Sequence, residues 1–292
     1  MYELVQVGER SYYIDCPAKM GIYRTEQGVC LIDSGGDKSA GRKIRQILEQ
    51  NGWTLRCILN THSNADHIGG NRYLQSQTGC PVFASGIEAD FARHTILAPA
   101  LLYGGCPPED LRHKFLLAEP SDVRPLEDDP AVPAELTVIP LPGHYFDMVG
   151  FRTPDDVVYL ADCVSSAATL EKYGVCFIYD VDAFLKTLDR VETMEARMFV
   201  PAHAQATPDV RELVRRNRAK VHEVAERLLD LCTEPTPFET ILQSIFRQYD
   251  LTMTFEQYAL VGSTVRSYLA WHRNAGRLEP VFEDNRLLWK RI

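Results

Sequence analysis

One ten-residue stretch, THSNADHIGG at 61–70, constrains this chain more than any other. It follows an apolar run that is typical of a buried strand, and its glycines mark the start of a helix. Alternate positions of an extended segment point the same way, so His62 and Asn64 face one centre, while Asp66 and His67 face a second centre beside it. Imidazole and carboxylate groups together suit a divalent ion such as zinc, iron or manganese. The sequence therefore predicts a metal site where this strand ends.

Four further polar residues stand where predicted strands end or loops open. Three come later in the chain, in the motifs Pro-Gly-His, Leu-Ala-Asp and Pro-Ala-His, and one carboxylate comes earlier, after a Leu-Ile pair. They are Asp33, His144, Asp162 and His203. These residues complete a ligand set of the kind that the first stretch begins.

In order and spacing, these motifs together resemble the metallo-β-lactamase superfamily. The resemblance covers residues 1 to about 205. It implies an α+β fold, a four-layer αβ/βα sandwich whose strand-end loops hold one or two metal ions along one edge. The joint pattern is specific, although Gly-His and Pro-x-His each occur in many unrelated proteins.

The resemblance also implies a role for each matching residue. The first metal would be held by His62, His144 and whatever stands at position 64, the second by Asp66, His67 and His203, and both by Asp162. Asp33 would orient a ligand through a hydrogen bond from behind the site. The ions would be divalent, with zinc favoured and iron or manganese as alternatives.

Position 64 departs from the family pattern, because the family usually has histidine there and this chain has Asn64. An amide oxygen is a weaker ligand for zinc than a neutral imidazole, so the first site loses affinity. Three states remain open: one metal in the second site, two metals with Asn64 or water completing the first, or an iron or manganese centre that tolerates more oxygen ligands.

The chemistry that the resemblance implies is hydrolysis by a metal-activated water of a small-molecule ester, thioester, lactone or related bond. Asp66 is the expected catalytic residue, since its free oxygen can hold the proton of the water. Two alternatives stay open. One is a non-heme iron redox enzyme on the same fold, either a sulfur dioxygenase or a flavodiiron-like protein. The other is a non-enzymatic binding module.

The last third of the chain predicts a second unit, so that residues 1–208 form the metal-binding domain and residues 209–292 a winged-helix-like domain. A helix opens near 208, capping boxes begin at Thr236 and Thr254, a third helix starts near Ser263, and a hairpin follows. From residue 211 on there are 13 basic and 11 acidic side chains, a net charge of +2. Such a weak positive charge argues against nucleic-acid binding and favours packing, a homodimer contact or a wall of the substrate cleft.

Between the predicted strands lies a helical insertion at about 86–134, with helical patches at 87–97 and 108–117. Insertions of this length usually carry binding loops. Tyr103 and Cys106 from the insertion are therefore candidate substrate contacts. Tyr173 and Tyr179, which follow the Asp162 motif, are further candidates.

Composition excludes several other classes of protein. The net charge is −9, which is unsuited to neutralising phosphates, and no apolar run approaches the length of a membrane span. The N-terminal residues lack the basic start of a signal peptide, so we expect a cytoplasmic protein. Eight cysteines without a Cys-x-x-Cys pair predict buried apolar packing in a reducing compartment, with neither a disulfide framework nor a thiolate zinc cluster.

Overall fold

The computed structural model describes residues 2–127 and 129–292 and contains two large sheets. Met1 and Asp128, which fall within the predicted first domain, lie outside the described residues. The seven-stranded sheet runs in chain order through β1 (Glu3–Gln6), β2 (Ser11–Asp15), β3 (Met20–Thr25), β4 (Gly28–Ile32), β5 (Leu55–Leu59), β6 (Val82–Ala84) and β7 (Val123–Pro125). The four-stranded sheet has the order β11 (Met198–His203), β10 (Val157–Ser165), β9 (Val149–Arg152) and β8 (Thr137–Pro140).

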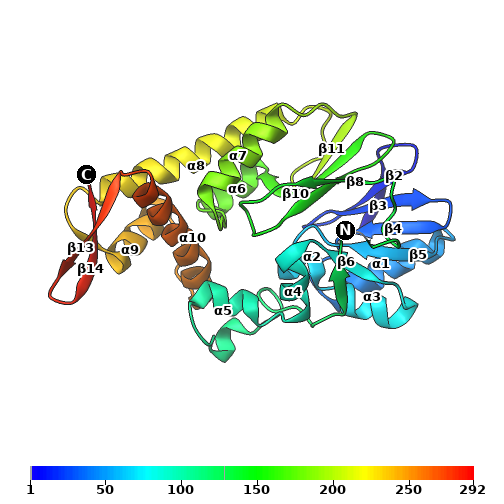
Figure 1. Ribbon diagram of the computed structural model, residues 1–292, viewed down its shortest axis with the longest axis horizontal. Helices are drawn as coiled ribbons and strands as arrows, with labels where there is room; N and C mark the ends of the chain where they lie inside the picture. Colours follow the sequence, from blue (N-terminus) through cyan, green and yellow to red (C-terminus); the bar gives the residue numbers. More distant parts are fainter. Residues whose placement is uncertain (1, 128) are drawn as a thin grey trace.

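Helices cover the outer face of each sheet, which makes four layers (Figure 1). The larger sheet is covered by α1 (Lys38–Gln50), α3 (Asn71–Thr78) and α4 (Gly86–Arg93), and the smaller sheet by α7 (Val181–Glu192) and α8 (Arg211–Leu231). Two short helices, α2 (Ala65–Ile68) and α6 (Ala167–Tyr173), follow β5 and β10. This arrangement confirms the predicted α+β sandwich.

Successive side chains of a strand point to opposite faces of the sheet and so pack in different layers. Along β4, Val29 and Leu31 pack under the helices, while Cys30 and Ile32 pack between the two sheets. Cys30 lies beside Cys57 of the neighbouring strand, with their sulfur atoms 3.3 Å apart and both side chains fully buried. All eight cysteines are free in the structure, and five of them are buried.

The insertion is less helical than its sequence predicts. The helix expected over 87–97 is broken at His94, so that α4 ends at Arg93 and α5 covers Leu97–Tyr103. The patch at 108–117 forms only the single 3₁₀ turn η1 (Glu109–Leu111), where the buried Leu111 fixes the chain. Strand β7 lies inside the expected insertion; three residues that end in proline carry too little alternation to predict a strand.

The C-terminal third has the predicted order of three helices and a hairpin. After α8 come β12 (Thr236–Pro237), α9 (Phe238–Gln248), α10 (Phe255–Asn274), β13 (Leu278–Glu283) and β14 (Arg286–Arg291). The helix start predicted near Ser263 is wrong, because α10 begins eight residues earlier. There the Thr254 hydroxyl caps the helix by accepting from the Gln257 backbone N–H. The box at Thr236 is also wrong as a cap: that hydroxyl bonds the Glu234 carbonyl, and the residue pairs with β14.

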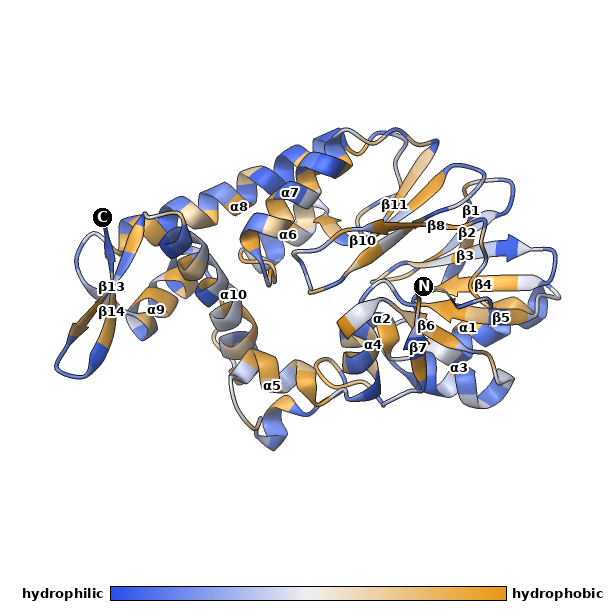
Figure 2. Cartoon of the chain, in the orientation of Figure 1, coloured by the Kyte–Doolittle hydropathy of each residue, from blue (hydrophilic) through white to orange (hydrophobic). Residues whose placement is uncertain are grey.

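The C-terminal helices share one hydrophobic cluster with the outer face of the smaller sheet. Leu160 of β10 and Leu188 of α7 belong to the same buried cluster as Val221 of α8 and Val265 of α10. Figure 2 shows hydrophilic residues on the outward side of α8. Among the described residues, no helix combines the length and apolarity needed to cross a membrane. The boundary at 208/209 and the winged-helix interpretation stay predictions.

Candidate metal centre

The predicted ligands come together at one edge of the sandwich, where strands of both sheets end. They lie after β5, on α2, in the turn after β8, on β10 and at the end of β11. Two ligand groups form there, each with its ligand atoms within 4.8 Å of one another: His62, His144 and Asp162 in the first, and Asp66, His67 and His203 in the second. The predicted set is therefore spatially compact, although its members span 142 positions of the chain.

Unusual backbone angles hold two carboxylates at this edge. Asp33 has a φ of 62° and Ala161, directly before Asp162, a φ of 50°, a region that non-glycine residues rarely adopt. The pairing of β10 with β11 shifts register around Ala161. Strain of this kind persists where surrounding contacts enforce it and is concentrated at functional sites.

Each of the four histidines is fixed through its Nδ1 atom. His67 Nδ1 lies 2.8 Å from an Asp33 carboxylate oxygen. His144 Nδ1 donates to the Phe177 carbonyl and His203 Nδ1 to the Pro17 carbonyl, each at 3.0 Å. The Thr61 hydroxyl donates to Asp33 and accepts from His62 Nδ1, at 2.7 and 3.0 Å. Because every Nδ1 faces an acceptor, each Nε2 is left with a lone pair for the site.

The Nε2 atoms converge on Asp162. Its oxygens lie 3.1 Å from His67 Nε2, 3.2 Å from His203 Nε2 and 3.5 Å from His144 Nε2. Buried without a hydrogen-bond partner in the described structure are His62 Nε2, His67 Nε2 and Asp162 Oδ1. An imidazole lone pair and a carboxylate lone pair at such distances repel unless a proton or a metal cation lies between them. The donor set is one that divalent transition metals prefer. The residues present fit a metal ion.

The carboxylates and histidines of the site shift one another's pKa values. Burial opposes ionisation of Asp162, but the imidazoles of His203 and His67 hold its pKa well below the ordinary value. Burial likewise opposes protonation of His203, yet Asp162 and Asp66 raise its pKa to about 10. Burial lowers the pKa of His62 well below its ordinary value. The site therefore favours ionised carboxylates that a cation can neutralise.

Asn64 occupies the place beside the first ligand group. Its side-chain nitrogen lies 3.0 Å from His144 Nε2, the atom that the first metal would need. An amide N–H that donates to this lone pair competes with a metal for it. That Asn64 weakens the first site stays a prediction.

Glu88 is a site residue that sequence reasoning missed. It is fully buried on α4 and accepts from the Ser63 backbone N–H at 3.0 Å and the Ser63 hydroxyl at 2.6 Å. Its other oxygen accepts from the Asp147 N–H at 2.9 Å. Burial raises the pKa of Glu88 to about 7. One carboxylate thus joins the turn that carries His62 to the loop that carries His144.

The candidate substrate residues divide. Two cavities, of about 630 and 340 Å³, open at the ligand groups. Tyr173 is 45% exposed and lines both of them. Tyr103 packs against Phe255, with ring centroids 6.0 Å apart, and Tyr179 packs against Phe146 at 3.9 Å. Neither these two tyrosines nor Cys106 is among the described residues that line those cavities. Roles for all four in substrate binding stay predictions.

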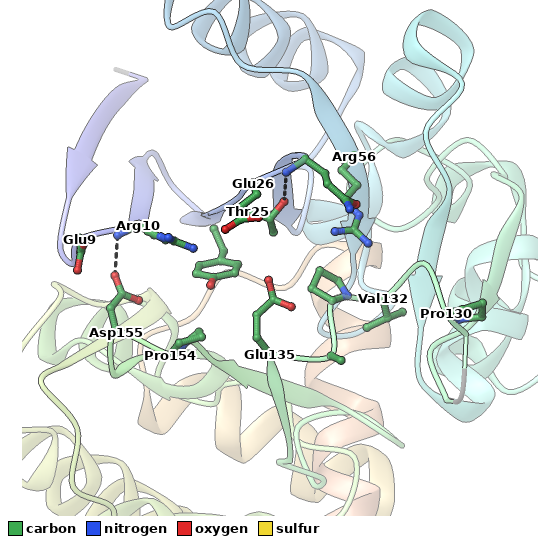
Figure 3. Close-up of a pocket in the computed structure, with 14 residues that line it drawn as sticks. Glu9, Arg10, Thr25, Glu26, Arg56, Pro130, Val132, Glu135, Pro154 and Asp155 are labelled. Atoms are coloured by element: carbon green, nitrogen blue, oxygen red, sulfur yellow. Dashed lines mark hydrogen bonds between the residues drawn. The ribbon is translucent and has the colours of Figure 1, made fainter.

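A cavity of about 670 Å³ at the opposite edge of the sandwich has different chemistry (Figure 3). It mixes arginines with carboxylates and has no histidine or cysteine among its described lining residues. Asp155 is already bonded there, at 2.7 Å from the Arg10 backbone N–H and 2.6 Å from the Ser11 hydroxyl. These bonds tie the two sheets together.

Comparisons with known proteins agree with this geometry. Residues 13–203 match the family model of the metallo-beta-lactamase superfamily. A hydroxyacylglutathione hydrolase of Bradyrhizobium sp. (strain ORS 278) is 33% identical over 130 residues, which are 44% of this chain and 40% of the relative. The "Probable metallo-hydrolase YqgX" of Bacillus subtilis (strain 168) is 32% identical over 150 residues, 50% of this chain and 63% of the relative. The matched segments thus span less than two thirds of either relative.

The fold is shared over a longer stretch. The crystal structure of a beta-lactamase domain protein from Burkholderia ambifaria superposes with a TM-score of 0.75 at 19% identity, covering 99% of this chain and 94% of the other. The likeness therefore extends through the C-terminal helices and hairpin. It is a likeness of fold alone.

Proposed function

The chain belongs to the metallo-beta-lactamase superfamily, and we propose that it is a metal-dependent hydrolase of a small-molecule ester, thioester or lactone. The observation that carries the proposal is the convergence of six histidine and aspartate ligands on one edge, with three of their polar atoms buried and unpartnered. The relative from Bradyrhizobium is named for hydrolysis of a hydroxyacylglutathione, which favours a thioester among these substrates. In the reaction, water adds its oxygen to the carbonyl carbon, the bond to the leaving oxygen or sulfur breaks, and the leaving group takes a proton.

The residues have distinct tasks in this proposal. The second ligand group with Asp162 would hold one divalent ion, and the first ligand group with Asn64 would hold another more weakly. Such an ion, when bound, lowers the pKa of water and stabilises the developing oxyanion. The Asp66 side chain is 48% exposed and lines both cavities, so its carboxylate can hold the water proton. Asp33 fixes the His67 ring through Nδ1.

The test is purification without chelator, metal analysis by mass spectrometry, and assays against p-nitrophenyl esters, lactones and acyl thioesters, including a hydroxyacylglutathione. We expect at least one equivalent of a transition metal and a loss of hydrolysis on chelation that added metal reverses. Asp66→Asn should lower kcat by about 100-fold or more, since proton transfer by a positioned side chain contributes 10²–10⁴-fold. Asp182→Asn, an exposed carboxylate paired with Lys186 on α7, is the matched control.

A protein without stoichiometric transition metal, and with none taken up on titration, would contradict the proposal. Iron as the native metal, together with oxygen uptake in the presence of a persulfide and no hydrolysis, would instead support the redox alternative.

A further inference from the structure

Two cavities open at the metal ligands and differ in the charged side chains beyond those ligands. Asp37, Lys114 and Lys172 line one cavity, whereas Glu256 lines the other. Both are lined by Asp66, His203, Tyr173 and Phe115. One, of about 630 Å³, carries Lys114 and is the polar arm of the cleft. The other, of about 340 Å³, leads from His144 and Asp162 toward the C-terminal helix α10 and is called here the apolar arm.

The apolar arm is built by segments that are far apart in the sequence. Apolar side chains from α5, from the segment after η1, from the chain after α6 and from α10 line it: Leu102, Leu116, Val175, Phe177, Leu260 and Val261. These side chains are largely buried: Leu102 is 8% exposed and Val261 is 3% exposed. Ser165, Thr169, Glu256 and Gln257 also line the arm, and its apolar side chains provide a surface on which an apolar ligand group is withdrawn from water.

Contacts between α5 and α10 hold the arm in shape. Leu102, Leu111 and Leu116 form a small buried cluster with Ala259 of α10. At the rim, His113 Nε2 lies 3.6 Å from a Glu256 carboxylate oxygen. Figure 1 shows α5 beside the N-terminal end of α10, at the open side of the sandwich edge. Side chains from the insertion and from the C-terminal region thus form this wall of the apolar arm together.

We propose that the apolar arm binds the acyl chain of the substrate, so that the preferred substrates are esters or thioesters of an apolar acyl group, and that Leu260 and Val261 set the longest chain accepted. The inference rests on the proposed function, because the ligand atoms at the inner end of the arm are those of the hydrolytic site. The wider polar arm, with Lys114 and Asp37 at its wall, leaves room for the leaving group.

Binding of unreactive chains tests the inference separately from catalysis. Straight-chain carboxylates from acetate to decanoate are titrated by calorimetry into the metal-loaded protein. Affinity should rise by about fourfold for each added methylene, the factor expected for burial of one CH₂, until the arm is full. Leu260→Trp should shorten the longest chain that still gains affinity, and Leu260→Ala should lengthen it. Leu287→Trp, at a half-exposed position of the C-terminal hairpin, should leave the series unchanged.

The same series of p-nitrophenyl esters gives the second readout, with kcat/KM following the carboxylate affinities. Hydrolysis that is indifferent to chain length, or carboxylate affinities that do not change at Leu260→Ala, would overturn the inference while the proposed function stands. Length-dependent binding without any hydrolysis would overturn the proposed function and leave the apolar arm supported.

Discussion

The two ligand groups lie at one edge of the sandwich. Each has two histidines and can use Asp162, but the fourth residue is Asn64 in the first group and Asp66 in the second. The second group has three ligating side chains of its own, Asp66, His67 and His203, and draws on Asp162 as a fourth. The first group has two histidines and the same Asp162, and its remaining place holds Asn64, whose amide nitrogen lies against His144 Nε2. In both groups every histidine is held through a hydrogen bond at Nδ1. We therefore expect the two groups to differ in their affinity for metal.

Removal of the shared ligand should have the largest effect, because it takes a ligand from both groups at once. We expect Asp162→Ala to lose both metals and to lower kcat/KM by about 10³-fold or more, since loss of a single electrostatic stabiliser already costs 10²–10³-fold. Metal content by mass spectrometry and hydrolysis rates measure the result. Retention of one tightly held metal would show that Asp162 is not shared.

A matched pair of histidine variants separates the groups. His203 and His144 each donate from Nδ1 to a backbone carbonyl at 3.0 Å, so their supports are comparable. His203→Ala should abolish tight metal binding, with an affinity loss of roughly 100-fold or more, because even an outer-shell partner of a ligand is worth 10–100-fold. His144→Ala should retain one equivalent. Equal losses in the two variants would contradict the ranking of the groups.

Glu88 bonds Ser63, next to His62, and Asp147, in the loop after His144, so its partners lie beside two members of the first group. All three of its hydrogen-bond partners donate to it, so Glu88→Gln must place an amide N–H against a donor. We expect about tenfold weaker metal binding at the first group, within the range for outer partners, and an unchanged second group. Asp90→Asn, on the exposed face of the same helix, is the control. A loss at both groups would mean that Glu88 acts on the whole edge instead.

The contrast between these residues shows what the sequence could predict. His62, His144 and His203 stand in short motifs at strand ends, and such ends are fixed by local hydrophobic patterns, so their meeting at one edge followed from the fold. Glu88 has no such signal, because it lies on an ordinary amphipathic helix 25 residues from its partner Ser63. Only the packing of α4 against the sandwich shows that this carboxylate is buried.

The residues that line the cleft could not be predicted from the sequence either. Leu260 and Leu102 line the site, yet nothing in the sequence marks either of them as more than an apolar residue. The late start predicted for α10 had left its first two turns, which face the cleft, outside the helix. Contacts between segments more than 150 residues apart depend on tertiary packing that periodicity cannot predict.

A gain of metal affinity, rather than a loss, is expected when the residue that the family usually has is restored at position 64. Asn64→His should add an imidazole to the first group and remove the amide that lies against His144 Nε2, raising the affinity for a second metal by about tenfold or more, the lower end of what one well-placed group contributes. Titration of a one-metal preparation with zinc measures the gain. Asn64→Ala is the control, since it frees His144 without adding a ligand. A gain in Asn64→Ala that equals the gain in Asn64→His would mean that the amide blocks the first site, whereas no gain in either would mean that position 64 does not decide metal occupancy.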